Sequence, residues 1–173
     1  MDTTVNALGG AMVWLLGSHP EQWQELRRLP PHRVNAVVNE VLRIEAPAQL
    51  FSRVAAVDAD VSGIEIAAGE RVAVIYGSAN RDERQYPDPD KFDIHRNAAG
   101  HLTFGTGLHA CAGQVLARIE LQAVLESMIE RVETLTVGDP TRKLNNVLRG
   151  FSHIPATFTP APVKDPVLSG ETA

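Results

Sequence analysis

The sequence has a single cysteine, Cys111, among its 173 residues. One thiol cannot form a disulfide within the chain, and the sequence therefore gives no sign of an oxidising compartment. A long apolar run is also absent, since the longest, residues 5–17, is shorter than the roughly 20 residues that cross a bilayer. No Lys or Arg precedes Arg27, whereas a secretory signal opens with positive charge. We expect a cytoplasmic protein that has no membrane partner.

Blocks of like charge are missing as well. The 16 Lys and Arg residues and the 21 Asp and Glu residues are spread along the chain and give a formal net charge of -5. Basic arms that bind nucleic acid are therefore excluded, and we expect no nucleic-acid partner. With 44% hydrophobic and 21% charged residues, the composition is that of a globular chain about one domain long. We expect this domain to cover residues 1–159 and a loose tail to cover residues 160–173.

Apolar residues at helical spacing predict four helices. The first covers residues 2–16, a short second one ends near Arg28, and the third covers residues 32–44. The fourth begins after Cys111 and is expected to run to about Thr134. Its expected inward face consists of Val115, Leu116, Ile119, Val124, Leu125, Met128, Ile129 and Val132.

Short segments rich in Val and Ile follow the third predicted helix. The expected strands, separated by turns at Ser62-Gly63 and Gly69-Glu70, are residues 51–57, 61–66 and 71–76. Residues 80–100 contain too much proline for a helix or an inner strand and are expected to form an ordered meander. Residues 144–158 are expected to form a late hairpin. The whole pattern predicts a mainly α fold with small β-sheets.

Cys111 lies in the stretch HLTFGTGLHACAG, residues 101–113, just before the fourth predicted helix. A thiol becomes a good metal ligand or nucleophile as the thiolate, which a helix N-terminus favours through its unpaired N–H groups and positive dipole end. Gly105, Gly107 and Gly113 let the backbone fold closely around the sulfur and let a flat ligand approach. An isolated cysteine is more often an inert small hydrophobe, so the surrounding pattern has to decide.

The segment FGTGLHACAG resembles the haem-binding loop of the cytochrome P450 family, F-x-x-G-x-x-x-C-x-G, at every fixed position. The resemblance implies that Cys111 is the axial thiolate ligand of the iron in haem b, where it would push electron density toward the metal. It also implies that Phe104 lies against the haem on the thiolate side and that His109 contacts a haem propionate. Gly105 and Gly113 would be cofactor-binding positions.

Glu40-Val41-Leu42-Arg43 resembles the family's E-x-x-R on a helix, a buried pair that an arginine of the meander joins. Arg81, Arg84 and Arg96 are the candidates for this arginine, and we favour Arg96, which follows Phe92-Asp93-Ile94. Taken alone, a Glu and an Arg three residues apart on a helix would form an exposed pair that contributes about 0.2–0.5 kcal/mol. The position of this pair upstream of the cysteine loop favours the buried, structural role.

Three further positions match family features by resemblance. Arg53, which opens an expected strand, matches an arginine that binds the second haem propionate. The opening residues MDTT resemble the end of the family's A-G-x-[D/E]-T-[T/S] segment on the long helix above the haem. The resemblance implies that Asp2 gates protons and that Thr3 hydrogen-bonds the oxygen bound at the iron.

The resemblance covers nearly the whole chain and implies the C-terminal part of the cytochrome P450 fold. That part holds the end of the oxygen helix, the E-x-x-R helix, a small sheet, the meander, the cysteine loop and the following helix. By family, we expect a haem-thiolate monooxygenase of the soluble bacterial kind, an oxidoreductase that inserts one atom of O2 into a small organic substrate. Its electrons would come from a ferredoxin or a flavoprotein. The N-terminal half of a typical member is missing, and we expect the truncated chain to be inactive alone.

Other interpretations stay open at this point. Gly105 to Ala110 also fits G-x-G-x-x-[G/A], which would indicate a dinucleotide-binding module between a strand and a helix. A non-enzymatic remnant that binds haem weakly or not at all is a further alternative. A phosphatase-like cysteine nucleophile fits less well, because that loop has arginine six positions after the cysteine, whereas Arg118 is the seventh.

Overall fold

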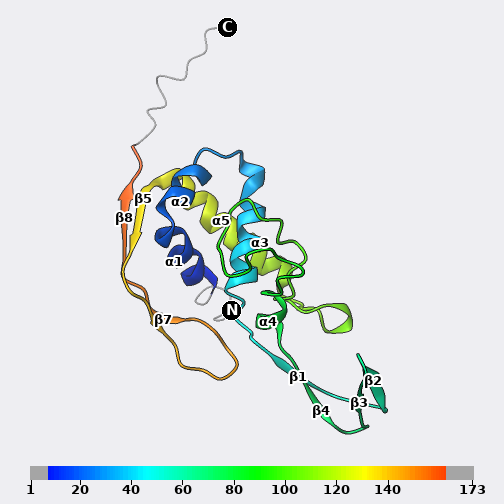
Figure 1. The fold of residues 1–173 in the computed structure, drawn as a ribbon. Coiled ribbons are helices and arrows are strands. Elements are labelled where there is room, and N and C mark those ends of the chain that lie inside the picture. Colours follow the sequence, from blue (N-terminus) through cyan, green and yellow to red (C-terminus); the bar gives the residue numbers. More distant parts are fainter. Residues whose placement is uncertain (1–7, 163–173) are drawn as a thin grey trace.

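A computed structural model describes residues 8–162 of the chain, and four helices form its central body (Figure 1). These helices are α1 (Gly10–Ser18), α2 (Pro20–Leu26), α3 (Val34–Ile44) and α5 (Gln114–Arg131). A short α4 (Tyr76–Ala79) and two 3-10 turns, η2 (Pro31–Arg33) and η3 (Gly107–His109), complete the helical part. No helix within residues 8–162 is long and apolar enough to cross a membrane. Residues 2–7 of the first predicted helix lie outside the described residues.

The strands form four separate two-stranded antiparallel sheets. The pairs are β1 (Phe51–Val54) with β4 (Arg71–Val74), β2 (Ala59–Val61) with β3 (Ile64–Ile66), β5 (Val132–Val137) with β8 (Ala156–Pro160), and β6 (Thr141–Arg142) with β7 (Phe151–His153). Strands β1 to β4 project away from the helices, whereas β5 lies against α1 and α2 (Figure 1). The prediction of a mainly α fold with small β-sheets is confirmed.

Two predicted boundaries are wrong for local reasons. The turn expected at Ser62-Gly63 is confirmed, since Ser62 (φ 56°) and Gly63 (φ 82°) adopt left-handed backbone. The expected strand at residues 61–66 is wrong, because this turn divides it between β2 and β3 of one hairpin. The fourth helix ends at Arg131 rather than at Thr134, since the β-branched residues that follow it pair with β8 in an extended conformation.

The late hairpin expected at residues 144–158 is also wrong. Strand β7 pairs with β6, and β8 pairs with β5, so the two strands of the expected hairpin belong to different sheets. Between them, the Pro155 carbonyl oxygen accepts a hydrogen bond from the Gly138 N–H at 2.9 Å, which joins the chain to the end of β5. In the earlier expected strand at residues 71–76, β4 ends at Val74 and Tyr76 already begins α4.

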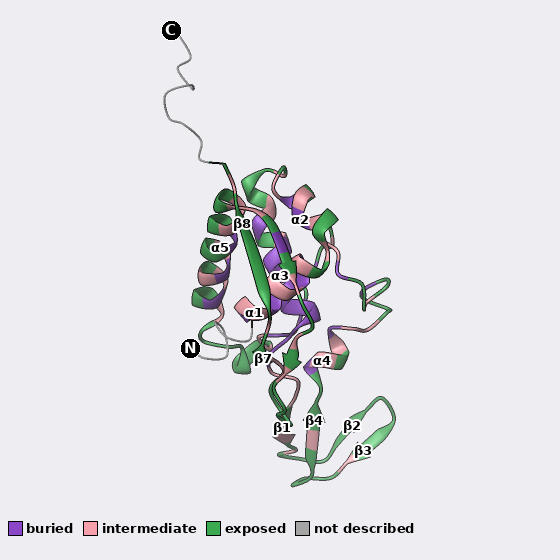
Figure 2. Cartoon of the chain, turned by 90° about the vertical axis from the view of Figure 1, so that its left-hand side faces the viewer, coloured by how far each residue is buried: buried purple, intermediate pink, exposed green. Residues whose placement is uncertain are grey.

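The hydrophobic core lies between α1, α2, α3 and α5 (purple in Figure 2). Four apolar side chains of α3 and the Trp23 side chain of α2 have no exposed surface. Full burial of side chains of this size contributes about 1.5–3 kcal/mol each. The four α3 side chains are Val37, Val38, Val41 and Leu42. Because α3 also carries the E-x-x-R pair, the core holds that pair in place.

Helix α5 is covered on one side only within the described part of the chain. Ala117, Leu121 and Leu125 are buried toward the core. The exposed fractions are 64% for Val115, 52% for Leu116, 57% for Ile119 and 48% for Val124, and these four residues are called the apolar α5 face below. The expected inward face of this helix is therefore wrong at these four positions. Periodicity detects adjacent apolar stripes, but it does not tell which of them is covered.

Candidate functional site

The cysteine loop, residues 101–113, folds back on itself ahead of α5. The Cys111 N–H donates a hydrogen bond to the Phe104 carbonyl oxygen at 2.8 Å. Gly105 (φ 66°) and Gly107 (φ 63°) have left-handed backbone, which glycine adopts without steric cost. The Cys111 thiol is free and exposed. The fold of the loop therefore presents the sulfur at the entry to the long helix.

Gly105→Ala is expected to destabilise the protein more than Gly107→Ala does. Positive φ costs an ordinary residue about 1–2 kcal/mol at either position. Only at Gly105 would an added Cβ be crowded, since it would lie 3.2 Å from the His109 carbonyl oxygen, whereas nothing lies within 4 Å at Gly107. Urea unfolding of both variants measures the two losses in free energy of unfolding. Equal losses would contradict the crowding argument.

A pocket of about 490 Å³ opens beside the cysteine loop. Four side chains selected from the sequence line it together, namely Arg53, Phe104, His109 and Cys111. The other lining residues are Gly105, Gly113, Leu8, Pro47, Ala48, Phe51, Tyr76 and Thr103, so the lining is mostly apolar. The fold thus brings Arg53 of β1 to the same cavity as the cysteine loop. Asp2 and Thr3 lie outside the described residues.

Tyr76 connects β1 to the cysteine loop and was not predicted as a site residue. The one feature of the sequence that could have indicated it is that Tyr76 is an aromatic residue at the end of an expected strand. Its hydroxyl accepts a hydrogen bond from Arg53 Nη2 at 3.4 Å, and its ring centroid lies 6.1 Å from that of Phe51. The same hydroxyl lies 3.8 Å from the place that a Cβ on Gly105 would take. The buried tyrosine therefore fixes the distance between the Arg53 guanidinium and the loop.

Arg118 of α5 packs against the cysteine loop from the core side. Its guanidinium carbon lies 5.1 Å from the centroid of the Phe104 ring, and it hydrogen-bonds the Asn39 side chain of α3. The hydrogen-bond partners of Arg118 are Asn39 and His101, whereas a phosphatase-like loop would require Arg118 at the Cys111 sulfur. Sequence reasoning weighed Arg118 only for that alternative and missed its contact with Phe104.

His101 is buried next to Arg118 and is held neutral. Its Nδ1 accepts a hydrogen bond from the Thr103 N–H at 3.2 Å, and its Nε2 lies 3.2 Å from an Arg118 nitrogen. Burial, followed by the positive charges of Arg118 and Arg43, lowers the pKa of His101 to about 4. A second proton, on Nδ1, would remove the acceptor that bonds the Thr103 N–H and would add a positive charge beside Arg118.

The free energy of unfolding is expected to fall as the pH drops from about 6.5 toward about 4. In this window the unfolded chain binds a proton at His101 that the folded chain does not, because the folded pKa is about 4 and the ordinary value is 6.5. A shift of this size corresponds to about 3 kcal/mol. Urea unfolding at a series of pH values, with His101→Asn as the non-titrating control, measures the effect. The variant should decline less steeply, and parallel pH profiles would contradict the assignment to His101.

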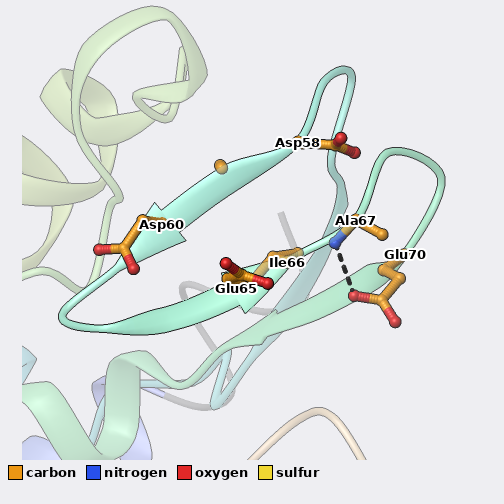
Figure 3. Close-up of a pocket in the computed structure, with 7 residues that line it drawn as sticks. Asp58, Asp60, Glu65, Ile66, Ala67 and Glu70 are labelled. Atoms are coloured by element: carbon orange, nitrogen blue, oxygen red, sulfur yellow. Dashed lines mark hydrogen bonds between the residues drawn. The ribbon is translucent and has the colours of Figure 1, made fainter.

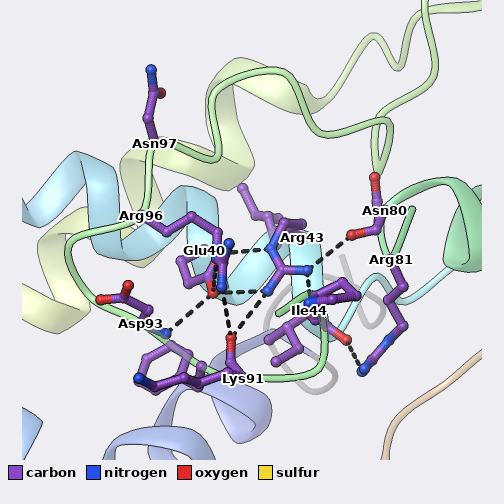
Figure 4. A network of polar contacts seen from close by, with 12 residues as sticks. Glu40, Arg43, Ile44, Asn80, Arg81, Lys91, Asp93, Arg96 and Asn97 are labelled. Carbon is purple, nitrogen blue, oxygen red and sulfur yellow. Dashed lines mark hydrogen bonds and ion pairs between the residues drawn. The ribbon is translucent and has the colours of Figure 1, made fainter. Parts of the chain in front are cut away.

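Glu40 and Arg43 form a buried ion pair on α3, joined by Arg96 (Figure 4). Glu40 is 0% exposed and Arg43 is 1% exposed. Arg43 donates to the two Glu40 carboxylate oxygens at 2.7 and 2.8 Å, and Arg96 Nε donates to one of them at 3.1 Å. Arg43 also donates to the carbonyl oxygens of Asn80 and Pro89 at 2.9 and 2.7 Å. The network therefore fixes the segment after α4 against α3.

The other two arginines considered for this network have different partners. Arg81 pairs with Asp90 and donates to the Ile44 carbonyl oxygen at 2.8 Å. Arg84 pairs with Asp82 on the surface, and its hydrogen bonds lower the pKa of Asp82 to about 2. Neither residue contacts Glu40, whereas Arg96 does.

A second pocket lies on the β2–β3 hairpin and is lined by carboxylates (Figure 3). Backbone N–H groups of neighbouring turns donate to three of them: Gly63 to Asp60 at 3.1 Å, Ala67 to Glu70 at 2.9 Å and Ala68 to Asp58 at 2.8 Å. Side chains of this type commonly stabilise turns in this way. Among the described residues, no group of three His, Cys, Asp or Glu side chains is arranged to hold a metal ion. These three carboxylates therefore stabilise the turns of the hairpin region.

The dinucleotide interpretation of Gly105 to Ala110 lacks its structural context. A G-x-G-x-x-[G/A] turn binds pyrophosphate between a strand of a parallel sheet and the helix that follows. Residues 101–104 form no strand, and the sheets within residues 8–162 are all antiparallel. The strand and the parallel sheet that this alternative requires are therefore not found within residues 8–162.

Comparison with known proteins gives consistent matches along this chain. The family model for Cytochrome P450 matches residues 3–159. Cytochrome p450 CYP199A2 of Rhodopseudomonas palustris is 41% identical over 162 residues, which cover 93% of this chain and 39% of that protein. The 6-deoxyerythronolide B hydroxylase of Saccharopolyspora erythraea is 39% identical over 153 residues, which cover 86% of this chain and 38% of that protein.

A solved structure agrees with these relatives. P450BioI, in complex with an acyl carrier protein ligated to hexadec-9Z-enoic acid, superposes with a TM-score of 0.85 and 39% identity, over 91% of this chain and 40% of that one. The chain thus spans about two fifths of the length of the relatives it matches. The family is one of oxidoreductases and implies a haem cofactor. This chain belongs to the cytochrome P450 family and carries the C-terminal portion of its fold.

Proposed function

We propose that this chain binds haem b through Cys111 and forms the thiolate side of a monooxygenase haem site. The observation that carries the proposal is the pocket of about 490 Å³ that Cys111, Phe104, His109 and Arg53 line together. These residues suit a haem, since they offer a thiol, an apolar surface and two side chains, Arg53 and His109, that can donate hydrogen bonds to the propionate carboxylates. A Cβ on Gly113 would lie 3.8 Å from the Cys111 sulfur, an ordinary van der Waals distance, so Gly113 lies directly beside the thiol.

Each residue of the proposed site has its own role. Phe104 packs against the cofactor, and Arg118 supports its ring from the core side at 5.1 Å. Arg53, fixed by Tyr76, and His109 bind the propionates through charge-assisted hydrogen bonds. Haem supplies the activation of O2 when it is bound, because no protein side chain performs that chemistry.

The complete reaction that we propose is insertion of one oxygen atom from O2 into a small organic substrate, in the cytoplasm, with electrons from a ferredoxin or a flavoprotein. Asp2 would hold a proton and Thr3 would donate a hydrogen bond on the oxygen side of the site. The matched relatives are more than twice as long as the aligned region, and the apolar α5 face is exposed. We propose that turnover needs the segments that make up the remaining length of the relatives and that residues 1–173 do not turn over alone.

The absorption spectrum of the haem-reconstituted protein, reduced under carbon monoxide, tests the proposed ligand. A Soret band strongly red-shifted from that of a histidine-ligated haem supports Cys111 thiolate ligation. Failure to take up haem would favour the non-enzymatic remnant. Substrate-dependent NADPH consumption with product formation by residues 1–173, in the presence of redox partners, would overturn the proposal that the chain is inactive alone.

A further inference from the structure

Glu45, directly after α3, is a buried carboxylate outside both the proposed haem site and the E-x-x-R network. It is 3% exposed, and two arginines hold it: Arg142 donates at 2.5 and 2.9 Å, and Arg149 donates at 3.0 Å to each oxygen. Burial alone would raise its pKa, but the hydrogen bonds and charges of Arg142 and Arg149 outweigh burial and lower the pKa of Glu45. Glu45, Arg142 and Arg149 are called the Glu45 cluster below.

The cluster is fixed in place by aromatic side chains from two other elements. The Arg142 guanidinium carbon lies 3.9 Å from the centroid of the Phe151 ring on β7 and 5.1 Å from that of Trp14 on α1. The two rings are themselves in contact, with centroids 5.3 Å apart. Cations over aromatic faces at these distances are attracted to the ring. Arg142 is therefore held in one orientation, and it presents a rigid fork to Glu45.

Next to the cluster, residues 47–49 pair with residues 147–149. The Arg149 N–H donates to the Pro47 carbonyl oxygen at 2.7 Å, and the Gln49 N–H donates to the Val147 carbonyl oxygen at 2.9 Å. Ala48 and Leu148 face each other between these bonds as an isolated antiparallel bridge. Pro47 and Ala48 line the 490 Å³ pocket. The cluster thus adjoins a short ladder, and one strand of this ladder, residues 47–49, includes the two residues that line the proposed haem site.

Apolar burial contributes little to the stability of this ladder. Leu144 is 96% exposed and Leu148 is 40% exposed, so the loop at residues 143–150 is poorly anchored by apolar burial. An isolated pair of short strands is marginally stable in water. Charge-assisted bidentate hydrogen bonds, in contrast, are strong and geometrically specific. The four bonds to Glu45 therefore reinforce the two backbone hydrogen bonds that join the loop to Pro47 and Gln49.

We propose that Glu45 is a positioning residue that, through Arg142 and Arg149, holds Pro47 and Ala48 in the wall of the haem pocket and so limits the size of ligand that the pocket accepts. The ligand-size part rests on the proposed function, whereas the placement of the wall does not. Glu45 itself touches neither the cofactor nor the ligand in this proposal.

Hydrogen exchange of the chain without haem tests the placement of the wall. In Glu45→Gln, the amide protons of Gln49 and Arg149 should exchange about tenfold faster, because a neutral amide loses the charge-assisted bonds. Amides of β5 and β8 should keep their rates. Arg149→Lys, which keeps the charge but loses the fork, should give a smaller acceleration. Glu25→Gln, the same change at the half-exposed pair with His95, is the matched control. Unchanged rates at Gln49 and Arg149, or equal acceleration throughout β5 and β8, would overturn the proposal.

Azole binding to the haem-loaded protein tests the ligand-size part. Imidazole and 4-phenylimidazole both ligate ferric haem, and the second is larger by a phenyl ring. In Glu45→Gln the dissociation constant of 4-phenylimidazole should fall by about tenfold, because the released wall no longer limits the size of the ligand. The dissociation constant of imidazole and the carbon monoxide spectrum should stay as in the wild type. Equal shifts for both azoles, or none for either, would overturn the ligand-size part. A wild-type protein without the red-shifted carbonyl band would instead refute the proposed function and leave the exchange result to decide on the wall.

Discussion

Cys111→Ser is expected to abolish the red-shifted Soret band of the reduced, carbon monoxide-bound protein. Serine keeps nearly the same volume on the same backbone, so the cysteine loop should fold as before. Its hydroxyl does not ionise near neutral pH, however, and the iron would lose its thiolate donor. The absorption spectrum, recorded on both proteins after the same haem reconstitution, measures this loss directly.

His109 provides the control for this experiment. It is the histidine that lines the same pocket, whereas His101 is buried and neutral beside Arg118. A histidine-like carbonyl spectrum in Cys111→Ser should therefore disappear in the double variant Cys111→Ser/His109→Ala. His109→Ala alone should keep the red-shifted band and bind haem more weakly, because it would lose the propionate contact proposed for His109. A red-shifted band that persists in Cys111→Ser would refute Cys111 as the ligand.

The local motifs of the site could be predicted from the sequence because their residues lie close together along the chain. The glycines that turn the cysteine loop are six residues or fewer from Cys111, and two of them do have positive φ. Glu40 and Arg43 are one helical turn apart on α3 and bond directly. Short-range patterns of this kind leave few alternative geometries.

Long-range partners could not be predicted in the same way, and Arg96, 56 positions from Glu40, was favoured through the family resemblance alone. Glu45 meets Arg142 and Arg149 across 97 and 104 positions of the chain, and Arg118 meets Asn39 across 79. No periodicity encodes such pairs, since they depend on how separate elements pack. The same limit explains the error at α5. An apolar stripe in one sequence does not reveal whether the residues that would cover it belong to the described part of the chain.

Arg43→Met is expected to lower the free energy of unfolding by about 3–5 kcal/mol, the range typical when one partner of a buried ion pair is removed. Glu40 would stay in a site with no exposed surface and keep only its bonds from Arg96 and from the Asp93 N–H. The carbonyl oxygens of Asn80 and Pro89 would lose their donors at the same time. Urea unfolding measures the loss. Arg84→Met, which removes an exposed guanidinium from the surface pair with Asp82, is the control that should leave the unfolding midpoint unchanged.

The double variant Glu40→Gln/Arg43→Met separates the charge from the packing. If the main cost of Arg43→Met is the uncompensated carboxylate, neutralising Glu40 should recover part of the lost stability, so that the two single losses exceed the loss in the double variant. Arg43→Lys, which keeps the charge but cannot reach both carboxylate oxygens and both carbonyls, should fall between the wild type and Arg43→Met and serves if the methionine variant does not fold. Strictly additive losses would show that Glu40 and Arg43 act independently. The segment after α4 would then owe its position to apolar packing of Phe92 and Ile94, which are 1% and 0% exposed, rather than to the ion pair.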